Sequence, residues 1–265
     1  MEPGPSTVFS CRADPRFSYC LYVPPPQGER RPELVVAVHG SLRMFTVLRD
    51  AFSAFGRWNH CVVLCPLFPS NVLGDDNDDG YKYLYEGALR YDRVLLSIIE
   101  DATARHPVAG ERFGLFGYSG GAHFAHRFFT LHPDRLWAVS IGAPGSVTLL
   151  DQTRDWWIGT RNAQDLFGVR VDPARMRRVP VQMVVGRVDL ETFEITHRQG
   201  DRYWMPGAND AGGNRPERLA MLRRSYEAHG IDVRFDVLPD VAHDVLRCAS
   251  AAQDFLGDVL RQRRD

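Results

Sequence analysis

The chain has almost no lysine, no long apolar run and almost no net charge. Lys82 is the only lysine among 32 basic residues, a scarcity that we attribute to genome composition, and the formal net charge is −1. Such a balance offers no strong field for nucleic acid or an anionic membrane, so we expect neither as a partner. No apolar segment approaches the roughly 20 residues that span a bilayer. The first residues lack the basic and apolar stretches of a signal peptide. We therefore expect a cytoplasmic protein.

Cysteines are few and form no regular framework. There are five, an odd number. Cys61 and Cys65 lie in an apolar segment and are interpreted as buried thiols, whereas Cys11 and Cys20 flank a short segment and could pair, although nothing requires it. A reducing compartment is the simpler assumption.

The 265 residues, with 44% apolar and 25% charged side chains, suit one large α/β domain or two small ones. Apolar runs and helical spacing alternate along the chain. We expect strands at 18–23, 34–38, 61–65, 111–116, 136–142, 179–185 and 231–238, and helices at 44–58, 86–106, 122–131, 215–229 and 241–261. This order predicts an α/β fold with a mostly parallel central sheet covered by helices on both faces.

Some details of this fold depend on particular segments. The run 18–23 is expected as an antiparallel edge strand, and Pro66 is expected to end the strand 61–65. The segments 145–178 and 190–213 do not fit the alternation. Long irregular insertions are usually functional loops, so we predict one domain over 1–265 with a small inserted cap.

Gly117-Tyr118-Ser119-Gly120-Gly121 is the most informative motif. It fits Gly-x-Ser-x-Gly, follows a predicted buried strand and precedes a predicted helix. That context is the one in which the motif forms a nucleophile elbow, a sharp turn that projects the serine oxygen away from the sheet. Ser119 is therefore the candidate nucleophile. A glycine-rich turn with an incidental serine is the alternative.

A nucleophilic serine needs a general base and an acid that orients it. In open parallel sheets, site residues follow the carboxyl ends of strands. Asp189 follows the strand 179–185, with Glu191 and Glu194 as fallback acids, and His243 follows the last strand at the start of the last helix. His123 and His126, on the helix after Ser119, are interpreted as packing or surface histidines; His197 and His229 fit the role of base less well than His243.

The tetrahedral intermediate of acyl transfer needs two N–H donors. We expect one from Gly120 and the other from Ser41, with Leu42 as the alternative, because His39-Gly40-Ser41 follows the first central strand. Tyr118 is expected to point away from the site, into the packing beneath the turn.

Val38-His39-Gly40, Gly117-Tyr118-Ser119-Gly120-Gly121, Gly186-x-x-Asp189 and the late His243 together resemble the α/β-hydrolase superfamily, over about residues 18–262. The general pattern is similar to its esterase, dienelactone-hydrolase and polyester-depolymerase branches. The resemblance implies an α/β-hydrolase fold and a Ser-His-Asp hydrolase that needs no cofactor. It does not specify the substrate.

Two further features of the sequence each have two possible interpretations. Asp75-x-Asn77-x-Asp79-Gly80 with Glu86 has the spacing of a calcium-binding loop, but no helix precedes it and Lys82 replaces the expected aliphatic residue, so we favour an acidic turn and expect no metal site. The side chains Trp156, Trp157, Trp204 and Met205 lie in the insertions and are candidates for substrate binding or for anchoring the cap.

The sequence favours a serine hydrolase that cleaves an ester bond of a small to medium, fairly apolar acyl substrate. The same triad also serves amidases or peptidases, thioesterases, lactonases and C–C hydrolases. A non-catalytic binding protein on this fold is the alternative outside enzymes. Self-association is left open by the sequence.

Overall fold

The computed structural model describes residues 2–264. Its centre is an eight-stranded sheet with the strand order β1-β2-β4-β3-β7-β8-β9-β10. These strands are β1 (Gly4–Ser10), β2 (Ser18–Val23), β3 (Glu33–Val38), β4 (Cys61–Leu67), β7 (Ala109–Tyr118), β8 (Leu136–Gly142), β9 (Val181–Gly186) and β10 (Val233–Leu238). A separate hairpin pairs β5 (Tyr85–Glu86) with β6 (Leu89–Arg90).

Strand direction divides the sheet into two parts. From β4 through β3, β7, β8 and β9 to β10 all neighbours are parallel. At the other end, β2 pairs antiparallel with β4, and β1 pairs antiparallel with β2. The predicted antiparallel strand 18–23 is confirmed, but it is not the edge, because β1 lies outside it. The sequence of β1 contains two glycine or proline residues at its start and gave no apolar run to predict it by.

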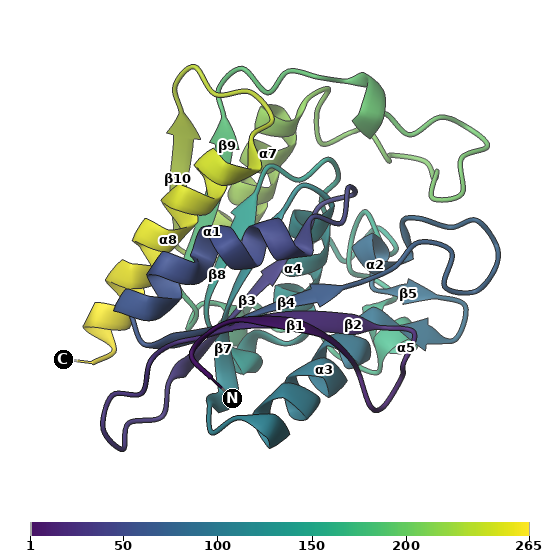
Figure 1. The fold of residues 1–265 in the computed structure, drawn as a ribbon. Helices are drawn as coiled ribbons and strands as arrows, with labels where there is room; N and C mark the ends of the chain where they lie inside the picture. Colours follow the sequence, from purple (N-terminus) through teal and green to yellow (C-terminus); the bar gives the residue numbers. More distant parts are fainter. Residues whose placement is uncertain (1, 265) are drawn as a thin grey trace.

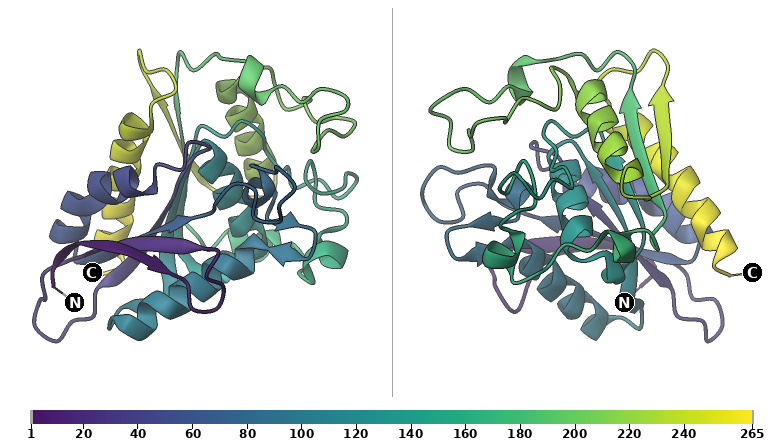
Figure 2. Two further views of the ribbon diagram at one scale, coloured as in Figure 1. Left: turned by 45° about the vertical axis from the view of Figure 1, so that its right-hand side comes forward. Right: turned by 180° about the vertical axis from the view of Figure 1, so that it is seen from behind.

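Helices cover both faces of the sheet (Figures 1 and 2). One layer contains α1 (Phe45–Trp58) and α8 (Val245–Gln262), which pack side by side. The opposite layer contains α3 (Tyr91–Arg105), α4 (Gly120–Leu131) and α7 (Arg215–Glu227). The shorter helices are α2 (Gly80–Tyr83), α5 (Ala163–Phe167), α6 (Pro173–Met176) and the 3-10 turns Pro133–Arg135 and Phe193–Ile195.

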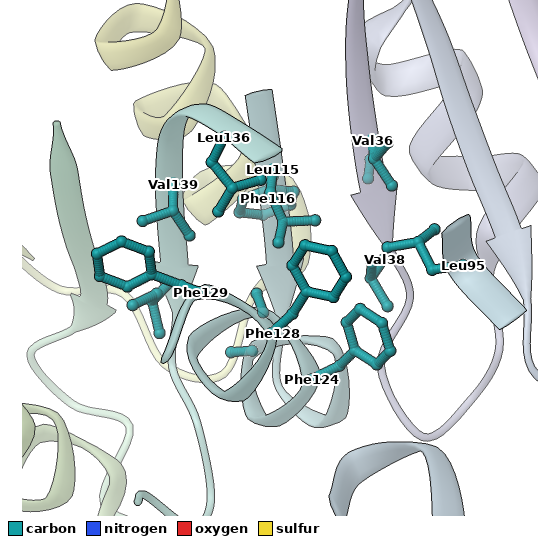
Figure 3. Close-up of a cluster of buried hydrophobic side chains, with 14 of the residues drawn as sticks. Val36, Val38, Leu95, Leu115, Phe116, Phe124, Phe128, Phe129, Leu136 and Val139 are labelled. Carbon is teal, nitrogen blue, oxygen red and sulfur yellow. The ribbon is translucent and has the colours of Figure 1, made fainter. Parts of the chain in front are cut away.

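The central strands are buried on both faces, which explains their unbroken apolar sequences. Figure 3 shows the packing on one face. There the phenylalanine side chains of α4, Phe124, Phe128 and Phe129, lie against valine and leucine side chains of β3, β7 and β8. On the other face, Phe116 of β7 contacts Phe52 of α1, with ring centroids 5.4 Å apart. The helix that follows Ser119 is thus held rigidly against the strand that precedes it.

Several predicted boundaries are wrong, three of them at residues singled out above. The helix predicted at 86–106 begins at Tyr91, because residues 85–90 form the β5–β6 hairpin. Pro66 does not end β4, which continues to Leu67. The last helix begins at Val245, where the side chain of Asp244 accepts hydrogen bonds from the Leu246 and Arg247 N–H groups. His243 therefore lies in the loop before the helix.

The two long insertions differ in form. Residues 145–178 contain α5 and α6 and pack onto the body, with Trp156 and Trp157 buried. Residues 190–213 contain one 3-10 turn and project beyond the ends of β9 and β10 (Figure 1). All five cysteines are buried and free, so the open question of a Cys11–Cys20 pair is answered against it. No helix among residues 2–264 is long and apolar enough to cross a membrane.

Candidate active site

Ser119 occupies a strained turn between β7 and α4. Its φ is 54° and its ψ is −116°, a conformation that residues with a side chain rarely adopt. The turn is held because the Ser119 N–H donates to the Gly142 carbonyl of β8 at 2.8 Å. Although Ser119 stands at the N-cap position of α4, its hydroxyl makes no capping hydrogen bond. The oxygen is thus left available to the space above the sheet.

The glycines around Ser119 are required by close backbone approach. A Cβ atom on Gly117 would overlap the carbonyl of Gly121, and one on Gly121 would overlap the carbonyl of Val38. The turn therefore packs directly against the end of the preceding strand and against β3. Only glycine permits this approach.

Asp189 and His243 meet at the ends of β9 and β10. The His243 Nδ1 atom donates to Asp189 Oδ2 at 2.7 Å, and the Asp189 side chain is buried. The two loops are tied by their backbones: the Val188 N–H donates to the Val241 carbonyl at 3.1 Å. A Cβ on Gly186 would overlap that same carbonyl, so this glycine lets the loops approach.

Arg215, at the start of α7, holds the other oxygen of the same carboxylate. Its Nη1 donates to Asp189 Oδ1 at 3.0 Å, and its Nη2 donates to Glu194 Oε2 at 3.0 Å. Arg215 is itself buried. Both oxygens of Asp189 are therefore fixed, one by the imidazole and one by a guanidinium.

Tyr118 lies against His243, with ring centroids 4.8 Å apart and planes inclined by 30°. The expectation that Tyr118 points away beneath the turn is wrong. The tyrosine ring instead packs against the imidazole. This contact limits the orientations that the His243 ring can adopt.

The loop after β3 is fixed by a neutral histidine. His39 Nδ1 donates to the Gly40 carbonyl at 2.8 Å, while His39 Nε2 accepts from the Phe68 N–H at 3.0 Å. Burial lowers the pKa of His39 to about 4. The imidazole is thus uncharged at neutral pH, as its acceptor role requires.

This loop places Ser41 beside Gly120. The Ser41 nitrogen lies 3.3 Å from the position that a Cβ on Gly120 would occupy. Within residues 2–264, neither the Gly120 N–H nor the Ser41 N–H donates to a protein acceptor. The two predicted donors are therefore close together and unused.

Ser119, His243, Gly120 and Ser41 all line one cavity of about 580 Å³. Among the described residues, no hydrogen bond joins Ser119 Oγ to His243. Catalytic hydrogen bonds are often long in ligand-free structures and tighten when substrate binds. The cavity thus brings together a strained serine, an oriented imidazole and two free N–H groups.

Comparison with known proteins supports the architecture. No protein-family model matches the sequence, and no curated protein matches it. Several solved structures are similar to this chain. A poly(3-hydroxybutyrate) depolymerase from Bordetella parapertussis is 20% identical over 91% of this chain and 84% of its own, with a TM-score of 0.72. Poly(aspartic acid) hydrolase-1 from Sphingomonas sp. KT-1 is 19% identical over 96% and 98%, with a TM-score of 0.75.

A fluorophosphonate-binding serine hydrolase of Staphylococcus aureus is also similar, at 12% identity over 98% of this chain and 99% of its own, with a TM-score of 0.59. The mostly parallel sheet of this chain, with helices on both faces, agrees with these similarities. The chain has the α/β-hydrolase fold.

In this α/β-hydrolase fold, the four side chains named as candidate substrate contacts lie away from the cavity lining. Trp156 Nε1 donates to the Tyr83 carbonyl at 3.0 Å, and Trp157 Nε1 donates to the Tyr203 carbonyl at 2.8 Å. Met205 packs partly buried against the core, and Trp204 is partly exposed. This corrects the expectation of substrate contact: Trp156 anchors the first insertion to the body, and Trp157 joins the two insertions to each other.

The side chains of the acidic segment 75–86 point to separate partners. Asp75 pairs with Arg202, Asn77 donates to Tyr203 Oη at 2.7 Å, and Glu86 accepts from Tyr91 Oη at 2.6 Å. In residues 2–264, no group of three or more His, Cys, Asp and Glu side chains is placed to hold a metal ion.

The two histidines of α4 and the two fallback acids are engaged by groups other than Ser119. His123 Nε2 accepts from the Gly145 N–H at 2.7 Å, and His126 Nε2 accepts from the Thr148 N–H at 3.0 Å. Both are buried, which holds the pKa of each well below its usual value. Of the fallback acids, Glu191 accepts from the Phe193 N–H at 2.8 Å, and Glu194 pairs with Arg215.

The roles of three residues of the site could not be predicted from a sequence motif. Arg215 is one of many arginines, and Tyr118 lies at the variable position of its motif. Lys82 also lines the cavity. Its only signal was that it is the chain's sole lysine.

Proposed function

We propose that this protein is a serine hydrolase that cleaves carboxylic esters of small to medium, fairly apolar acyl substrates. The observation that carries the proposal is the hydrogen bond of 2.7 Å from His243 to the buried Asp189, because the imidazole of His243 lines the same cavity as the strained Ser119. The similar solved structures include proteins named as a depolymerase, hydrolases and esterases, which agrees with ester cleavage. The proposed chemistry requires no cofactor.

In the proposed reaction, Ser119 Oγ attacks the ester carbonyl carbon and His243 Nε2 takes the hydroxyl proton. Asp189 orients the imidazole and stabilises its protonated form. The carbonyl oxygen becomes an oxyanion that the Gly120 and Ser41 N–H groups bind. The bond to the alcohol then breaks, and His243 returns the proton to the leaving oxygen. Water, activated by the same histidine, releases the acid from Ser119.

The cavity lining supports a substrate with an apolar part. Five apolar side chains border it from the loop after β3, from α1 and from the start of α8: Leu42, Met44, Val47, Leu48 and Val245. Burial of such a surface favours apolar acyl or alcohol groups. A panel of matched esters, thioesters, amides and lactones would separate ester hydrolysis from the other reactions that this triad can perform.

The first test is labelling with a fluorophosphonate probe, with the adduct mapped by mass spectrometry. We expect modification of Ser119 alone, and its loss in Ser119→Ala and His243→Ala. Ser119→Ala should also reduce kcat for an accepted ester by several orders of magnitude without unfolding the protein. An unlabelled but folded protein would contradict the proposal and favour a binding role.

A further inference from the structure

The active-site cavity has two chemically different sides. One is formed by the apolar side chains from the loop after β3, α1 and α8 described above. The other contains ionisable groups from three separate segments: Asp79, Lys82, Glu194, His197 and Arg215. Ser119 and His243 also border this space. A substrate in the cavity therefore meets charge on one side only.

The charges on the polar side are graded by depth. The side chains of Arg215 and Lys82 are 3% and 12% exposed, whereas those of Asp79 and Glu194 are 40% and 68% exposed. The cations thus lie inside and the anions lie at the mouth, where water screens them. The interior of the polar side favours an anionic group.

Lys82 is the cation whose free donors are available to a ligand in the cavity. Both terminal nitrogens of Arg215 are engaged, by Asp189 and by Glu194, and its unpaired Nε is buried away from solvent. The ammonium of Lys82 contacts Asp79 Oδ1 at 2.5 Å, and no second acceptor for it is found among residues 2–264. An ammonium has three N–H donors, so two remain. Burial lowers the pKa of His197 to about 4, which leaves that ring uncharged at neutral pH.

Lys82 also borders the place expected for the carbonyl oxygen. Its Cε lies 2.9 Å from the position of a Cβ on Gly120, and the Ser41 nitrogen lies 3.3 Å from the same position. The ammonium is one bond beyond Cε. A group bound by Lys82 would thus lie near the scissile carbonyl.

We propose that Lys82 forms an anion-binding subsite and that the enzyme prefers esters whose otherwise apolar acyl part carries a second carboxylate. This inference rests on the proposed function, because it assigns a substrate class to the same cavity. A charge-assisted hydrogen bond from an ammonium to a carboxylate is stronger than one between neutral groups. Asp79 opposes the substrate carboxylate and limits the preference.

Two esters of equal chain length test the subsite. Ethyl pentanoate and monoethyl glutarate differ in that a terminal carboxylate replaces a methyl group. We expect wild type to have the higher kcat/KM for monoethyl glutarate, measured by pH-stat titration. Lys82→Met should lower kcat/KM for the glutarate ester at least tenfold more than for the pentanoate ester, mainly through KM. Asp79→Asn should have the opposite effect and raise the ratio of kcat/KM for the glutarate ester to kcat/KM for the pentanoate ester.

Arg202→Met is the matched control. Arg202 also pairs with an aspartate, Asp75, but lies outside the lining of the active-site cavity. Its removal changes the net charge as Lys82→Met does, and we expect the ratio to stay at the wild-type value. An equal loss on both esters in Lys82→Met, or no change in their ratio, would overturn the proposal.

Binding without turnover separates this proposal from the proposed function. Monoethyl glutarate should bind to the Ser119→Ala variant more tightly than ethyl pentanoate does, as measured by calorimetry. Adding Lys82→Met should remove that difference. Equal binding of the two esters before the lysine is replaced would overturn the subsite. The two proposals can also fail separately. If wild type hydrolyses neither ester but the difference in binding depends on Lys82, the subsite is supported and only the hydrolase function is contradicted.

Discussion

At the scale of single residues, Arg215 lies beside Asp189, the proposed catalytic acid. It fixes Asp189 Oδ1 at 3.0 Å while His243 holds Oδ2 at 2.7 Å. The carboxylate therefore cannot rotate without losing a charged partner. A guanidinium so close also opposes the positive charge that His243 acquires during catalysis. We interpret Arg215 as a positioning residue. It fixes the orientation of Asp189, although its charge weakens the stabilisation that Asp189 gives to a protonated His243.

Replacing Arg215 by methionine should have two separable effects. The free energy of unfolding should fall by about 3 kcal/mol, because one partner of a buried pair is left uncompensated. The kcat for an accepted ester should also fall, because Asp189 Oδ1 loses the partner that fixes the carboxylate against His243. Urea unfolding and steady-state kinetics measure these effects. Arg215→Lys keeps the charge, so a loss of stability as large as that of Arg215→Met would contradict the argument from an uncompensated charge.

At the scale of elements, the elbow depends on how closely β7, α4 and β3 approach. A methyl group on Gly121 would overlap the carbonyls of Val38 and His39. Gly121→Ala should therefore cost about 1–3 kcal/mol of stability, the usual cost of overpacking, and should lower activity by displacing Ser119.

Thermal or urea unfolding would measure this cost. Gly213→Ala is the control, since its methyl would meet only Glu217, at 3.6 Å. Equal stability of the two variants would contradict the close-packing argument.

The elements that the sequence predicted well are those whose pattern is local. The strands 18–23 and 136–142 are confirmed at both ends, because continuous β-branched and aromatic runs need no distant partner to be recognised. Pro66 was misjudged because its tolerance depends on a neighbour. Pairing with β3 stops at Leu64, so at Pro66 the strand is paired with β2 alone, where a missing N–H is accepted.

In the candidate site too, the residues that could be predicted are those with a local sequence signal. Ser119, Asp189 and His243 could be proposed because each follows a strand in a recognisable place, and the structure brings Asp189 and His243 into contact. Arg215, Tyr118 and Lys82 could not, because their roles arise from tertiary contacts that no short motif encodes. Trp156 and Trp157 were expected near the substrate because the sequence does not show which distant carbonyls accept hydrogen bonds from their indole N–H groups.

At the scale of the whole molecule, buried neutral histidines make stability depend on pH. Burial lowers the pKa of His39 and of His197 to about 4, and holds those of His123 and His126 well below the ordinary value. As the pH falls from about 7 to about 4, the unfolded chain binds these protons and the native state does not. The free energy of unfolding therefore falls with pH across that window.

For His39 alone the loss should be on the order of 3 kcal/mol between pH 7 and pH 4. Urea unfolding at intervals across this range measures it. His39→Gln removes the titrating ring while keeping a donor and an acceptor. The variant should lose less stability than wild type on acidification, and an equal loss in both would contradict the assignment.

The position of Lys82 has a practical consequence. It is the only lysine in the chain, and it lies inside the cavity beside Gly120. Reagents that acylate side-chain amines would find a single ε-amino group, and it lies inside the cavity. A small acylating label that reacted there would block the cavity, whereas a solid support would find no surface lysine to couple to. Immobilisation of this protein calls for chemistry directed at carboxylates or at an added tag.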